Sequence, residues 1–93
     1  MTRRIIVVGD GGSHAGARVI SGSPHDTIEG RAVARKGDLV DCPQRYPGGK
    51  PHGINRIVEG SLNDLLDGVP LALEGHRTEC GCVLVGSVPD AVL

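Results

Sequence analysis

The sequence predicts a small, mostly β domain, built as a cone from three strand–turn–strand repeats around a pseudo-threefold axis. Two observations predict this fold: a threefold internal repeat and a high glycine content. Of the 93 residues, 15 are Gly, about double the usual share. Such an excess indicates many tight turns rather than long helices. The length suits a single domain spanning residues 1–93.

The repeats open at Gly9, Gly37 and Gly75, and each carries a His or Cys five residues after this Gly. Each repeat closes with aliphatic residues and a Gly-Ser pair. Gly-Asp and Gly-Ser are common turn pairs, so one such unit could arise by chance, but chance explains three units with the same His or Cys position poorly. Repeated units bury a core by packing against one another. Three units are too few for a solenoid, so we expect a compact cone.

Short strands are predicted to lead into the repeats. Residues 30–37 and 68–75 have the same length, run from Gly to Gly, and share an Ala at the same position. Their alternation suits strands with one buried face. The expected strands are residues 5–8, 32–35 and 71–73, and we expect their free edges to form the base of the cone. The alternative is that these strands form the internal core.

One stretch carries a helical pattern. Leu62, Leu65 and Leu66 follow the spacing of one helix face. Ser61 precedes them and could cap such a helix, and Gly68 could end it. We therefore expect one or two helical turns here at most, and β structure elsewhere.

Charge and aromatic content exclude a nucleic-acid binder. The formal net charge is −1, and the chain has one Tyr, no Phe and no Trp. It therefore offers neither the basic face nor the stacking platform that nucleic acids require. No apolar run reaches the ~18 residues of a membrane span, and the run after Arg4 stops at Gly9, too short for a signal peptide. We expect a protein made in the cytoplasm, without stable membrane insertion.

The repeated His and Cys positions predict a metal site. Threefold placement would bring His14, Cys42 and Cys80 to equivalent points near the axis. His52 lies nine residues before the Ser that closes its repeat, as His14 does, so it is the natural fourth ligand. Structural zinc sites are closed and four-coordinate, with thiolate and imidazole ligands. Three cysteines cannot all pair within one chain, and in a reducing cytosol they are more often metal ligands. The sequence therefore predicts a metal ion near the axis of the cone.

Three further residues of the same types are interpreted as structural. Cys82 is expected to pack as a small buried hydrophobe at the start of the strand Val83-Leu84-Val85. His76 stands where the other repeats have Asp10 and Asp38, which indicates a turn residue. His25 is expected to be a solvated polar residue in a turn.

The sequence resembles the PAAR-repeat family. The resemblance rests on the tract 30–38, followed by Cys42-Pro43, His52-Gly53-Ile54, residues 68–72 and Cys80-Gly81. These motifs occur in order along nearly the whole chain.

This resemblance implies a structural tip that caps and sharpens the trimeric VgrG spike of type VI secretion systems, aiding membrane puncture and effector delivery. One chain would cap one trimer, and effector proteins would be further partners. The family's apical metal, usually zinc, implies one structural zinc at the matching positions His14, Cys42, His52 and Cys80. Longer family members carry toxin extensions, and we expect no effector extension here. The tip would be assembled in the cytoplasm and exported with the spike.

Two other functions are considered. A metallohydrolase needs an open metal position and a nearby general base. Glu59, Glu74 and Glu79 are available, but no H-E-x-x-H motif occurs and four ligands favour a closed site. A small metal-binding interaction or regulatory module is the other alternative, which only a search for partners would separate from the tip. The sequence therefore favours a protein that is not an enzyme.

Overall fold

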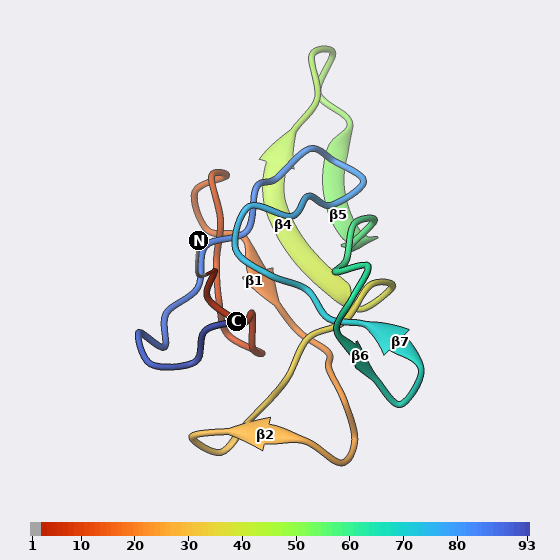
Figure 1. Ribbon diagram of the computed structural model, residues 1–93. Helices are drawn as coiled ribbons and strands as arrows, with labels where there is room; N and C mark the ends of the chain where they lie inside the picture. The colour runs from red at the N-terminus through yellow and green to blue at the C-terminus, as the bar shows by residue number, and fades with distance from the viewer. Residues whose placement is uncertain (1–2) are drawn as a thin grey trace.

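The chain folds as an elongated, all-β molecule with principal extents of 38 × 25 × 24 Å (Figure 1). The computed structural model describes residues 3–93, among which there is no helix, and hence none that could cross a membrane. The strands form three antiparallel sheets, ordered β1-β4-β5, β2-β3 and β6-β7. Their bounds are β1 Arg18–Val19, β2 Thr27–Ile28, β3 Arg31–Ala32, β4 Leu39–Arg45, β5 Pro51–Arg56, β6 Leu65–Leu66 and β7 Val69–Pro70.

A ring of three backbone hydrogen bonds marks the axis of the molecule. The N–H of Ile6 donates to the carbonyl of Ala72 at 3.0 Å, that of Ala34 to Ile6 at 2.8 Å, and that of Ala72 to Ala34 at 3.1 Å. All three residues are fully buried. A closed cycle of this kind requires three equivalent segments around one axis, so the predicted pseudo-threefold arrangement is confirmed.

The lead-in segments are therefore internal, and the expectation that their free edges form the base is wrong. Their residues pair with one another across the axis instead of lying open. This pairing satisfies backbone groups that an exposed edge would leave free. Side chains such as that of Val33, 5% exposed, consequently belong to the core. The pairs are Val7 with Val33, Arg35 with Leu71, and Ile5 with Leu73.

The next layer of the core contains one large aliphatic side chain from each repeat. Val19, Ile57 and Leu84 are each at most 1% exposed. Their carbonyls accept hydrogen bonds of 2.8 to 2.9 Å from the Gly that opens a repeat. Burying one such side chain contributes about 1.5–3 kcal/mol. The aliphatic end of each repeat thus supplies the core of a chain that has no Phe or Trp.

In each repeat, a side chain accepts a hydrogen bond from the backbone N–H three residues before it and so closes the turn. Asp10 Oδ2 accepts the N–H of Val7 at 3.0 Å, and Asp38 Oδ2 accepts that of Arg35 at 2.8 Å. In the third repeat His76 Nδ1 accepts the N–H of the residue three before it, at 2.9 Å. The interpretation of His76 as a turn residue in an Asp position is confirmed.

One short segment, called a lobe here, extends from the core after each of the three repeats. Two of them are the hairpins β2–β3 and β6–β7, whose turns have two positive φ angles each, 51° and 77° at Glu29-Gly30 and 55° and 77° at Asp67-Gly68, as in type I′ turns. The third lobe is closed by the two ends of the chain. Arg3 and Leu93 exchange two backbone hydrogen bonds of 2.9 Å, so the described ends lie side by side (Figure 1).

The helical turn expected around Leu62 is wrong, because β6–β7 occupies this stretch. The Oγ of Ser61 accepts the N–H groups of Asn63 and Asp64, as a helix cap would. No helix follows, because the Asp-Gly turn reverses the chain. Leu62 is 94% exposed and Leu65 58% exposed, so the leucines form no buried face.

Candidate metal centre

The hairpin β4–β5 projects at one end of the molecule and carries two of the expected ligands (Figure 1). Cys42 on β4 lies opposite Gly53 on β5, so His52 would face the other side of a regular ladder. The register shifts beyond Cys42, and Gly53 has a φ of +62°. This irregularity brings the His52 side chain to the same face as the Cys42 thiol.

The other two ligands lie on turns that are tied to this hairpin. The turn that carries His14 is held because Ser13 exchanges hydrogen bonds of 2.8 and 2.9 Å with Val83. The N–H of Cys80 donates to Asn55 Oδ1 on β5 at 3.2 Å. Each turn is therefore fixed by another repeat, and the site depends on the whole fold.

The four side chains converge to within 4.8 Å of one another. Cys42 Sγ lies 3.4 Å from His14 Nδ1 and 3.3 Å from His52 Nδ1, and Cys80 Sγ lies 3.7 Å from His14 Nδ1. Tetrahedral zinc with Zn–S of ~2.3 Å and Zn–N of ~2.0–2.1 Å separates S and N by about 3.6 Å. The geometry therefore fits one tetrahedrally coordinated metal ion, with both imidazoles presenting Nδ1.

The two thiols differ in how readily they ionise. Burial raises the pKa of the Cys42 thiol, which is 1% exposed. Burial also acts to raise the pKa of Cys80, but hydrogen bonds from the Thr78 hydroxyl and the Cys82 backbone lower it below its ordinary value. The thiolate is the form that binds a metal. Cys80 is accordingly the thiol of the two that loses its proton more easily.

Comparison with known families agrees with this architecture. The family model described as PAAR motif matches residues 8–86, which include all four converging side chains. The chain belongs to the PAAR motif family. No curated protein matches the sequence.

Cys82 and His25 lie outside the group of four converging side chains. Cys82 is fully buried in the main core cluster. A Cβ added at Gly12 would lie 2.6 Å from Cys82 Sγ, so this thiol packs against the first repeat. His25 is exposed. These placements agree with the interpretation of both residues as structural.

Three residues around the site have roles that the sequence reasoning missed. Thr78 Oγ1 lies 3.2 Å from Cys80 Sγ, and Asn55 holds the Cys80 backbone. The ring centroid of Tyr46 lies 4.1 Å from that of His52. Thr78 and Asn55 belong to no sequence motif that would have indicated their roles. The sequence offered one indication of the role of Tyr46. It is the single Tyr of a chain without Phe or Trp, and it lies in sequence between the candidate ligands Cys42 and His52.

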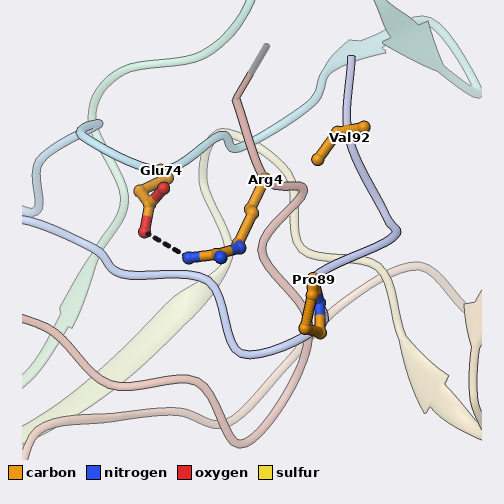
Figure 2. Close-up of a pocket in the computed structure, with 4 residues that line it drawn as sticks. All are labelled: Arg4, Glu74, Pro89 and Val92. Atoms are coloured by element: carbon orange, nitrogen blue, oxygen red, sulfur yellow. Dashed lines mark ion pairs between the residues drawn. The ribbon is translucent and has the colours of Figure 1, made fainter.

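A hollow elsewhere on the PAAR chain is lined by none of the four converging residues (Figure 2). It is lined by Arg4, Glu74, Pro89 and Val92 and contains an ion pair of 3.8 Å between Arg4 Nη1 and Glu74 Oε1. These residues belong to the lobe closed by the chain ends and to the turn beneath it. The pair links that lobe to the third repeat, but both side chains are partly exposed to solvent, so it adds little to stability.

Proposed function

We propose that this PAAR chain is the structural tip of a contractile secretion machine of the type VI kind, capping a trimeric VgrG-type spike. The observation that carries the proposal is the hydrogen-bonded ring of Ile6, Ala34 and Ala72, together with the family match. A single chain built this way presents three similar surfaces, which is what the end of a symmetric trimer requires. The tip would be assembled in the cytoplasm and exported with the spike and its effectors.

We propose that the lobes form the docking surface. Hairpins β2–β3 and β6–β7 lie at the opposite end from the point of β4–β5 (Figure 1). A second apolar cluster, centred on Val7, Val33 and Val88, lies beneath the lobes. Leu65 on β6, which is 58% exposed, adds apolar surface. Contact through this end would leave the metal group at the leading point of the spike.

Zinc is the proposed metal, in a structural role. His14, Cys42 and Cys80 come from different repeats, with His52 beside Cys42 on the hairpin, so one ion would cross-link all three. Structural zinc contributes roughly 10–16 kcal/mol of apparent binding energy in small domains. A point under mechanical load needs such reinforcement because a short chain buries little core.

A hydrolytic role has no support in the surroundings of the site. Four protein ligands fill a tetrahedral ion and leave no position for water. The three candidate glutamates are also engaged elsewhere, and Glu74 pairs with Arg4 at 3.8 Å. Glu79 Oε1 accepts the N–H of Arg56 at 2.8 Å, and Glu59 pairs with Arg77 at 3.2 Å. None of the three is free to act as a general base.

The test is binding to a purified trimeric VgrG-type spike from the same cell. Wild type should bind, whereas Leu65→Asp should weaken binding because it places a charge on the proposed docking lobe. Ile54→Asp is the matched control, since Ile54 is similarly exposed at 62% but lies on β5. The proposal fails if wild type does not bind, and the lobe assignment fails if only Ile54→Asp loses binding.

A further inference from the structure

Tyr46 extends the metal group into a row of three rings. The chain has no other Tyr, Phe or Trp. The ring centroid of Tyr46 lies 4.1 Å from that of His52, with an interplanar angle of 57°. The His52 ring centroid in turn lies 5.1 Å from that of His14. Aromatic rings at such separations attract one another beyond simple burial. Tyr46 therefore touches the site from outside.

Hydrogen bonds at the hairpin end hold the backbone of Tyr46 in place. The N–H of Tyr46 donates to the carbonyl of Lys50 at 2.8 Å, and its carbonyl accepts the N–H of Gly49 at 2.9 Å. Arg45 Nη1 donates to the Gly49 carbonyl at 2.8 Å. Gly48 and Gly49 supply the positive φ angles of 98° and 95° that the turn needs.

His52 is the aromatic residue that covers the Tyr46 ring. Every residue from 43 to 51 is exposed, so the hairpin end has no core of its own to bury a ring in. Tyr46 is nonetheless only 40% exposed, and His52 is its one aromatic contact in residues 3–93. The covered part of the ring lies against a metal-ligand candidate.

We propose that Tyr46 is a positioning residue of the metal centre, which holds the His52 imidazole with Nδ1 toward Cys42 and slows metal loss. The inference rests on the proposed zinc site. The terminal torsion of His is broad and roughly two-fold, so an unsupported ring turns readily. An imidazole packed at a tilt against the Tyr46 ring must break that contact before it can turn away. An aromatic contact of this kind corresponds to roughly a 2- to 10-fold change in rate.

The experiment measures how fast zinc leaves the loaded protein. Protein holding one Zn²⁺ per chain is mixed with an excess of a chromophoric chelator, and the release rate is followed by absorbance. Tyr46→Ala should release zinc about 2- to 10-fold faster, while still binding one ion. Tyr46→Phe keeps the ring and should release zinc at the wild-type rate. Ile54→Ala, at an exposed position of β5, is the control for a generally loosened hairpin.

A second background shows whether Tyr46 acts through His52. His52→Cys keeps a ligand and removes the imidazole, so adding Tyr46→Ala should then change the release rate no further. Equal release from wild type and Tyr46→Ala overturns the inference, as does an equal acceleration by Ile54→Ala. If wild type binds no metal, the zinc site itself fails. Normal zinc content with no effect of Tyr46 refutes the positioning role alone.

Discussion

His76 performs in the third turn the contact that Asp10 and Asp38 perform in the first two. To accept the Leu73 N–H, its Nδ1 must carry no proton, so the turn needs neutral imidazole. Burial and the nearby charge of Arg3 lower the pKa of His76 below 6.5, against a smaller opposing effect of Glu59. The electrostatic surroundings therefore favour the form that the turn requires.

The first prediction concerns the free energy of unfolding as a function of pH. Below pH 6.5 the unfolded chain protonates His76 while the folded chain resists, so the stability contributed by this turn is complete above pH 6.5 and is lost as pH falls. His76→Asp restores the residue of the other repeats and should remove this loss. Denaturant titrations at pH 7.5 and 5.5 should show a smaller decrease for the variant than for wild type. Equal decreases would contradict the assignment.

The second prediction separates the two cysteines of Cys80-Gly81-Cys82. Cys80→Ser should lose the metal, because Cys80 Sγ belongs to the converging group. Cys82→Ala should keep one metal per chain, because Cys82 lies in the core. Elemental analysis of the purified variants decides between them. Loss of metal from Cys82→Ala alone, in a folded protein, would place the ligand two residues away from Cys80.

At the scale of elements, the hairpin β4–β5 places two ligands on one face only because its ladder is irregular. Gly53 supplies a positive φ of 62° where the register shifts. A Cβ at this position would meet no atom within 4 Å. A substitution there is opposed by backbone strain alone, which makes the consequence for the site measurable.

The third prediction compares Gly53→Ala with Gly48→Ala. Both positions have positive φ and open space, so each variant should lose about 1–2 kcal/mol of stability. Only Gly53→Ala should also weaken metal binding, because it alters the backbone beside His52. Chelator competition measures the metal affinity and thermal unfolding measures the stability. Equal metal affinity in the two variants would show that the Gly53 conformation does not position His52.

The elements also show what the sequence could and could not predict. The common spacing of His14, Cys42 and Cys80 was sufficient to place them together, because the repeats fold alike around the axis. The β6–β7 hairpin was missed because three leucines have helical spacing, although the Asp-Gly pair at 67–68 is a hairpin signal. Tyr46 was missed because its contact with His52 depends on the closed turn of the hairpin end.

The expected base edges failed for a reason that belongs to the whole molecule. The local sequence of residues 5–8 is compatible with an edge strand, because it does not show which residues they pair with. Pairing partners such as Val33 and Leu73 lie far along the chain. Only the closure of all three repeats reveals that the lead-in segments form the centre.

The fourth prediction uses the third lobe, in which the paired ends replace a hairpin turn. The pair Arg3 and Leu93 corresponds to the pairs that flank the two-residue turns of β2–β3 and β6–β7. A circular permutant that joins Leu93 to Arg3 through Asp-Gly and opens between Asp67 and Gly68 should fold. It should bind one metal ion, as measured by elemental analysis, and unfold cooperatively. A permutant that stays unfolded with metal present would show that the lobes are not interchangeable.

The central claim is that one chain, held by one metal ion, caps one trimer. Native mass spectrometry of the tip bound to its purified trimeric spike measures both quantities together. The account predicts a mass of three spike subunits, one tip and one zinc ion, with His14, Cys42, His52 and Cys80 required for the zinc. Three tips per trimer, or a complex of normal stability without metal, would contradict it.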